Sequence, residues 1–139
     1  MANKSLFLDT AYVLALFNTR DQWHPKAIEW QKKIALDNSY LITTEFVLAE
    51  IGDGLSSQNL RANAVDIIRI LIESPTVRVI PADSSLFMQG LRLYESRPDK
   101  DWGLTDCTSF VIMQDFDVSD ALTTDGHFEQ AGFNPLLIG

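Results

Sequence analysis

Three aspartates occur where a parallel α/β sheet would bring their side chains together. Asp9 directly follows the short apolar run at residues 5–8, and Asp125 follows the apolar run at 121–123 in the same way. Asp106 lies at the start of a segment with helical character. Ligands of open α/β sheets bind outside the carboxyl ends of the strands. We therefore expect the three carboxylates to converge on one crevice.

Each of these aspartates, taken alone, also has a purely structural explanation. Aspartate after a strand often forms a turn or a helix cap, and aspartate in a first helical turn gains about 0.3–1 kcal/mol from the helix dipole. Glu50 is harder to explain in this way. At ~3.6 residues per helical turn it projects between Phe46 and Val47, with Gly54 one turn further on. A carboxylate on this apolar face requires a cation or hydrogen-bond donors.

Four carboxylates without a pair of Cys or His at ligand spacing favour a hard cation, Mg²⁺ or Mn²⁺, over zinc. His127 follows Asp125 by two residues and either approaches a substrate or is an ordinary surface-loop histidine. We expect Cys107, the single cysteine, to lie in the core because the helix that carries it must pack.

The elements that position these residues alternate between strand and helix. Apolar and β-branched runs predict strands at residues 5–8, 40–42, 77–80, 121–123 and 136–138. Apolar residues at helical spacing predict helices at 11–17, 21–36, 46–55, 59–72, 83–94 and 105–114, with a turn at 125–132. The expected N-caps are Thr10, Thr43 or Thr44, Asp83 or Ser84, and Thr105. Residues 97–103 form a polar loop. This alternation favours a parallel sheet with helices on both faces.

The composition predicts one soluble domain over residues 1–139, because 46% hydrophobic and 22% charged residues are ordinary values for a globular chain. The longest apolar run, residues 11–17, is far shorter than the ~20 residues that cross a bilayer. We therefore expect no membrane segment. Asp9 interrupts the only stretch that resembles an export signal. A single cysteine fits a reducing compartment, so the cytoplasm is the expected location.

The charge is strongly asymmetric along the chain. Residues 1–70 hold seven Lys or Arg and eight Asp or Glu, whereas residues 71–139 hold four and eleven. Nearly all of the net charge of -8 therefore lies in the second half. Phosphate binding is driven largely by Lys and Arg, so charge alone disfavours a nucleic-acid partner. Bound divalent cations reverse that inference because they invert the local field.

Four segments in this order and spacing resemble PIN-domain proteins, in particular the VapC-type ribonuclease toxins. They read LFLDTAYVLALF, TTEFVLAEI, DKDWGLTDCTSFVIM and ALTTDGHFEQAGF and span nearly the whole chain. The resemblance implies a three-layer α/β/α sandwich with a central, mostly parallel sheet. It also implies a Mg²⁺- or Mn²⁺-dependent ribonuclease site, an RNA substrate, a cognate antitoxin and a homodimer.

The resemblance also implies roles for particular residues. The metal-binding and catalytic acids of the family fall on Asp9, Glu50, Asp106 and Asp125. Polar positions that line the family's site fall on Thr10, Thr124, Thr105 and Ser109. Asp101 is either close to the site, as in several relatives, or a solvated loop charge. The residues expected to bind the substrate are basic ones among Lys26, Lys32, Lys33, Arg61, Arg92, Arg97 and Lys100.

Two other functions remain open from the sequence. One is a PIN-like binding or regulatory module with weak catalysis, which the net charge favours and the four intact acids disfavour. The other is a solitary RNA-processing nuclease without an antitoxin. A haloacid-dehalogenase phosphatase is disfavoured because Ala11 stands where its second aspartate would be. A flap-cutting DNA nuclease is disfavoured because the chain has little room for a helical arch.

Overall fold

A computed structural model describes residues 4–138 and contains a five-stranded parallel sheet. The strands lie in the order β3-β2-β1-β4-β5. Their bounds are β1 Ser5–Leu8, β2 Tyr40–Thr44, β3 Val77–Ile80, β4 Asp120–Leu122 and β5 Asn134–Pro135. The chain thus starts in the middle of the sheet, builds outward to β3, and then crosses back to add β4 and β5.

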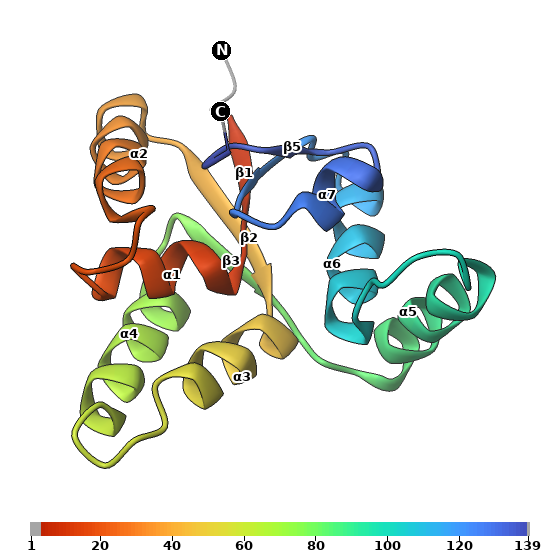
Figure 1. Cartoon of the computed structure of the whole chain (residues 1–139), viewed down its shortest axis with the longest axis horizontal. Helices are drawn as coiled ribbons and strands as arrows, with labels where there is room; N and C mark the ends of the chain where they lie inside the picture. The colour runs from red at the N-terminus through yellow and green to blue at the C-terminus, as the bar shows by residue number, and fades with distance from the viewer. Residues whose placement is uncertain (1–3, 139) are drawn as a thin grey trace.

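Helices cover both faces of this sheet. Helices α1 to α4 lie on one side and α5 to α7 on the other, which makes three layers (Figure 1). Their bounds are α1 Thr10–Phe17, α2 His24–Asp37, α3 Glu45–Gly54, α4 Arg61–Glu73, α5 Ser84–Ser96, α6 Leu104–Asp115 and α7 Gly126–Gln130. The predicted α/β/α sandwich with a parallel sheet is confirmed. None of the helices described is long and apolar enough to span a bilayer.

The central strand of the sheet, β1, is buried on both faces. Leu6, Phe7 and Leu8 of β1 are all at most 1% exposed, as expected for a parallel strand that is covered on both faces. Phe7 is aligned with Ile42 of β2 on one side and with Ala121 of β4 on the other. The strand order reverses between β1 and β4, and such a reversal opens a crevice at the carboxyl ends of the strands.

Threonine side chains secure the carboxyl end of the central strands. The Thr43 hydroxyl donates a hydrogen bond to the carbonyl oxygen of Leu8 at 2.8 Å, which ties β2 to β1. The Thr44 hydroxyl accepts one from the Val47 N–H at 3.2 Å and so caps α3, as predicted. The backbone N–H of Asp9 donates to Leu122 at 3.3 Å, extending the pairing of β1 with β4 by one residue.

Two predicted N-caps are wrong. Helix α1 begins at Thr10, so the N-cap position is occupied by Asp9 and not by Thr10. The Thr10 hydroxyl is directed to Glu50 instead of the helix backbone. Helix α6 begins at Leu104 and is capped at Gly103, so Thr105 lies inside the first turn. The Gly103 N–H donates to Asp106 at 3.1 Å, and this contact fixes the start of the helix. The Asp83 cap of α5 is confirmed.

The last strand is also displaced from its predicted position at 136–138. The regular pairing with β4 involves Asn134 and Pro135. Leu136 and Leu137 continue beside β4 through single hydrogen bonds to Ala121 and Thr123, but without a regular ladder. Proline has no N–H to donate, so β5 remains a short edge strand. The other elements agree with the prediction within about two or three residues.

An aromatic cluster fixes α6 and α7 against the sheet. The Phe110 ring of α6 lies 5.0 Å from that of Phe128 in α7 and 5.1 Å from that of Trp102, both nearly perpendicular to it. The Trp102 indole N–H also donates to Gln130 at 3.0 Å. Trp102 therefore anchors an otherwise polar loop, and the first turn of α6 has a fixed position relative to α7.

Helices α5 and α6 approach closely at Gly90. A Cβ atom at this position would lie 2.5 Å from Cγ2 of Thr108 and 3.3 Å from the backbone nitrogen of Thr108. Thr108 is 1% exposed and β-branched, so its side chain has no free space into which to rotate. Only glycine fits at position 90 without separating the two helices.

We expect Gly90→Ala to reduce the free energy of unfolding by about 1–3 kcal/mol, the usual cost of overpacking a core. Urea denaturation measures this change. Gly52→Ala is the matched control, because a Cβ at Gly52 would make only an ordinary 3.7 Å contact with Ile68. Alanine favours a helix over glycine by up to about 1 kcal/mol, so the control should be neutral or stabilised. Equal stability of the two variants would contradict the close contact at Gly90.

Candidate active site

An acidic cleft of about 660 Å³ lies at the carboxyl ends of β1 and β4. We call it the acidic cleft. Its lining comprises Asp9, Thr10, Ala11, Leu14, Glu50, Asp53, Asp106, Thr124, Asp125 and His127. Five of these residues are carboxylates, and no lysine or arginine of the described chain lines it. The cleft therefore concentrates negative charge at the point where the strand order reverses.

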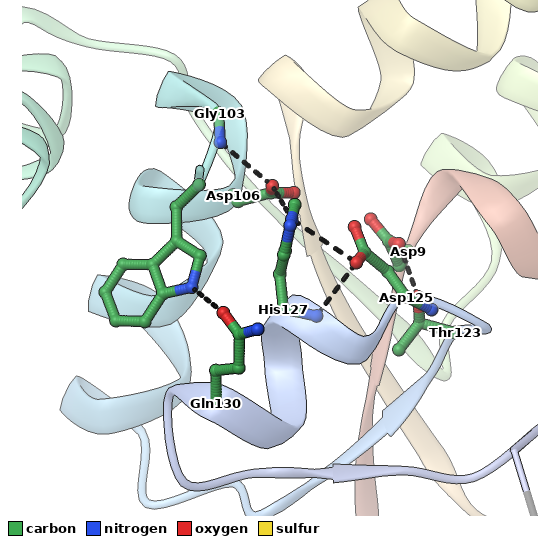
Figure 2. Close-up of polar contacts among 8 residues, drawn as sticks. Asp9, Gly103, Asp106, Thr123, Asp125, His127 and Gln130 are labelled. Atoms are coloured by element: carbon green, nitrogen blue, oxygen red, sulfur yellow. Dashed lines mark hydrogen bonds and ion pairs between the residues drawn. The ribbon is translucent and has the colours of Figure 1, made fainter. Parts of the chain in front are cut away.

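Asp9 is the most deeply buried of these acids, with 6% exposure. It follows β1 directly, between the ends of β2 and β4. Its Oδ2 accepts a hydrogen bond from the Thr123 hydroxyl at 2.7 Å, so its orientation is fixed from β4 (Figure 2). Burial raises the pKa of Asp9 to about 7, and the nearby charges of Asp106 and Glu50 add to the rise.

Glu50 reaches the same cleft from the middle of α3. Its Oε1 accepts a hydrogen bond from the Thr10 hydroxyl at 2.8 Å, which connects α3 to the start of α1. Partial burial raises the pKa of Glu50, and the charges of Asp106 and Asp53 raise it further. Of the residues predicted beside Glu50 on this helix, Val47 is fully buried, Phe46 is half-buried and Gly54 is exposed, so Glu50 lies at the edge of the apolar face.

Asp106 belongs to the first turn of α6, where the Gly103 N–H holds its Oδ2 at 3.1 Å. Burial raises the pKa of Asp106, and the charge of Asp125 contributes, while the donors of Gly103 and His127 act in the opposite direction. Figure 2 shows the His127 ring between Asp106 and Asp125. Its Nδ1 lies 3.4 Å from an oxygen of each carboxylate.

Asp125 is positioned by the turn between β4 and α7. Its backbone N–H donates to the Thr123 hydroxyl at 3.0 Å, and its Oδ1 accepts from the His127 N–H at 2.9 Å, which caps α7. The single hydroxyl of Thr123 thus accepts from the Asp125 backbone and donates to Asp9. The turn after β4 consequently orients two carboxylates of the cleft at once.

The four predicted acids Asp9, Glu50, Asp106 and Asp125 all line the acidic cleft, together with Thr10 and Thr124. Three other predicted positions lie outside it. Thr105 lines a separate pocket of about 140 Å³ beside Phe46 and Phe87. Ser109 is completely buried in α6, and its hydroxyl has no hydrogen-bond partner among the described residues. Asp101 is an exposed residue of the loop before α6.

Two polar residues of the site were not predicted from the sequence. Asp53 lines the cleft one helical turn after Glu50, and its spacing of three residues on one helix was the available signal. The Thr123 hydroxyl contacts two acids of the site. The pattern of a threonine two residues before an aspartate indicates such a turn. Cys107, which was expected in the core, is fully buried.

The donor chemistry of the cleft fits a divalent cation. Ligand atoms of Asp106, Asp125 and His127 all lie within 4.8 Å of one another. Burial raises the pKa values of Asp9, Glu50 and Asp106, and repulsion between neighbouring carboxylates adds to the rise. Carboxylate oxygens are the preferred ligands of hard cations. A cation bound by these side chains would offset their negative charge.

Known proteins resemble this chain over nearly its full length. The 23S rRNA-specific endonuclease VapC20 of Mycobacterium tuberculosis is 29% identical over 129 residues, which cover 92% of this chain and 95% of that protein. The crystal structure of VapC20, described as a Sarcin-Ricin loop cleaving toxin, superposes with a TM-score of 0.80 at 26% identity. That match covers 94% of this chain and 97% of the other.

A more distant structure shares the fold alone. FitAcB from Neisseria gonorrhoeae matches with a TM-score of 0.62 at 20% identity, over 94% of this chain and 97% of the other. The family model of the PIN domain matches residues 6–134, a range that reaches from β1 to β5 and includes every residue of the acidic cleft. The chain therefore belongs to the PIN domain family.

Proposed function

We propose that this chain, residues 1–139 as one domain, is a metal-dependent endoribonuclease that hydrolyses RNA phosphodiester bonds. The observation that carries the proposal is the acidic cleft: five carboxylates from four separate segments meet at the strand reversal with no lysine or arginine among them. The name of VapC20 as an rRNA endonuclease supports RNA as the substrate. A cleft of this charge attracts a phosphate only with bound cations.

In this proposal Asp9, Asp106 and Asp125 hold one or two Mg²⁺ or Mn²⁺ ions, and Glu50 completes the cluster. Such an ion lowers the pKa of a bound water and neutralises charge on the scissile phosphate. The residues behind the ligands keep them in place. Thr123 orients Asp9, and the Gly103 N–H orients Asp106.

Three further residues have supporting roles. The Thr10 hydroxyl keeps the Glu50 carboxylate turned into the cleft. Thr124 lies on the cleft wall, where its position allows contact with the substrate. His127 lies 3.4 Å from both Asp106 and Asp125 and holds these two side chains at a fixed separation. Supporting groups of this kind typically change metal affinity or activity by about 10- to 100-fold.

We further propose that the protein is the toxin of a toxin–antitoxin pair that acts in the cytoplasm as a homodimer. Its similarity to VapC20, described as a toxin, supports this role. An antitoxin segment with basic residues would complement the acidic cleft electrostatically. A neighbouring short reading frame for a DNA-binding antitoxin would support the toxin role, whereas a solitary gene would favour RNA processing.

Cleavage of an RNA panel that includes 23S rRNA tests the nuclease proposal. We expect purified wild type to cut RNA with Mg²⁺ or Mn²⁺ and not with EDTA. Asp9→Asn and Asp106→Asn each remove one ligand charge at nearly constant size, and we expect each to lower the cleavage rate at least about 100-fold. Gel analysis of labelled RNA measures the rates.

Asp101→Asn is the matched control for cleavage, since it makes the same charge change on an exposed loop residue outside the cleft. We expect it to cut at the wild-type rate. Undiminished cleavage by Asp9→Asn would contradict the proposed mechanism. A wild type that is free of any co-purified partner, binds no divalent cation and cuts nothing would favour the binding-module function instead.

The buried Asp9 also makes stability depend on pH. Its pKa is about 7 in the folded chain against an ordinary value of 3.8, so between pH 4 and 7 the folded state retains a proton that the unfolded state has lost. Stability must then fall as pH rises through this window. We expect the stability of Asp9→Asn relative to wild type, measured in EDTA, to be about 2–3 kcal/mol greater at pH 8 than at pH 5.

Urea denaturation at the two pH values measures this difference, with Asp101→Asn as the control that should follow wild type at both. Added Mg²⁺ should stabilise wild type at pH 8 because it binds only the folded cluster, and it should stabilise Asp9→Asn much less. An equal difference between Asp9→Asn and wild type at both pH values would show that Asp9 has an ordinary pKa.

A further inference from the structure

A second hollow, of about 520 Å³, adjoins the acidic cleft along helices α1 and α3. We call it the Arg20 hollow. It is lined by the end of α1, residues 18–21, the end of α3 and Leu60. Leu14 lines both spaces, and Asp53 of the cleft is followed directly by Gly54 of the hollow. The two spaces are therefore adjacent, with Leu14 between them, and we refer to them together as the groove.

The two parts of this groove differ in charge. The acidic cleft carries five carboxylates, whereas the hollow contains one cation, Arg20, and one acid, Asp21. Asp21 is already engaged, since its Oδ1 accepts from the Trp23 N–H at 2.7 Å.

The guanidinium of Arg20 is free to bind a ligand. The side chain is exposed, and within residues 4–138 it makes no hydrogen bond or ion pair; only its backbone N–H is bonded, to Asn18 at 3.0 Å. Arg20 is thus the single basic side chain along the groove in the described chain.

Gly54 keeps the floor of the hollow open. A Cβ atom at this position would lie 3.2 and 3.3 Å from the two methyl carbons of Leu14. Leu14 is the residue that lies between the hollow and the cleft. A side chain at position 54 would therefore push Leu14 into the path between the two spaces. Glycine at position 54 avoids this displacement of Leu14.

We propose that the Arg20 hollow is a subsite for a phosphate of the RNA strand whose scissile phosphate occupies the acidic cleft. The inference rests on the nuclease function proposed above. Every phosphate of an RNA strand carries a negative charge, and the cations of the cleft serve only the scissile one. The next phosphates require a protein cation, and a guanidinium binds phosphate oxygens through two parallel N–H groups. A basic protein segment would be repelled at this end of the groove.

Steady-state cleavage of a single-stranded RNA in Mg²⁺ tests the subsite. We expect Arg20→Gln to raise KM about 10-fold, since a hydrogen bond to a charged group is lost, and to leave kcat within about twofold. Arg20→Lys retains the charge and should restore most of the KM. Arg69→Gln is the matched control, because Arg69 is an exposed arginine of α4 that lines neither space.

Equilibrium binding gives an independent measurement. In the Asp9→Asn background, fluorescence anisotropy with a labelled RNA should show weaker binding when Arg20→Gln is added. The slope of log Kd against log salt should also decrease by about 0.7, the value for one phosphate contact on a single strand. A residue with only a structural role would not change this slope.

The outcomes separate the two proposals. Active wild type with Arg20→Gln indistinguishable from Arg69→Gln in KM and in salt dependence would overturn the subsite and leave the nuclease function intact. A loss confined to kcat would overturn it as well. Wild type that cuts no RNA with any metal would overturn the nuclease function. In that case unchanged RNA binding by Arg20→Gln would reject the subsite separately.

Discussion

A carboxylate buried at the end of the central strand, with no positive charge beside it, is the constraint on which the rest of this structure depends. Asp9 lies between the two strands that flank β1, and burial there disfavours its charged form, which raises its pKa to about 7. Lysine or arginine would neutralise it, but would also fill the space that a divalent cation needs. The fold supplies neutral donors instead, Thr123 to Asp9 and Thr10 to Glu50, which orient the acids and leave the charge uncompensated.

The sequence was sufficient for the architecture and for the main acids, for reasons that are local. Short apolar or β-branched runs such as residues 5–8 and 77–80 favour strands, and the helices between them favour parallel pairing. The ends of those strands then locate Asp9 and Asp125, the start of a helix locates Asp106, and an apolar helix face singles out Glu50. The resemblance to PIN-domain proteins matched all four acids to one site. The family assignment, which rested on four ordered segments, is confirmed by the match over residues 6–134.

What the sequence did not predict depends on contacts between distant segments. The packing of α3 on α1 decides whether Thr10 caps its own helix or bonds to Glu50. Gly103, and not Thr105, is the N-cap of α6 because the Gly103 N–H donates to Asp106. The contact of Thr123 with the Asp125 N–H is local, whereas its contact with Asp9 exists only once β4 lies beside β1. Asp53 had a local signal, the helical spacing from Glu50.

The order of the strands has a consequence for the time at which the site forms during synthesis. Asp9 is synthesised well before its neighbour Thr123 and the partner acids Asp106 and Asp125, which follow it by roughly a hundred residues. A nascent chain that has completed β1, β2 and β3 has an open edge on β1 where β4 will pair. The carboxylate cluster is therefore incomplete until α6 and β4 have been added to the sheet.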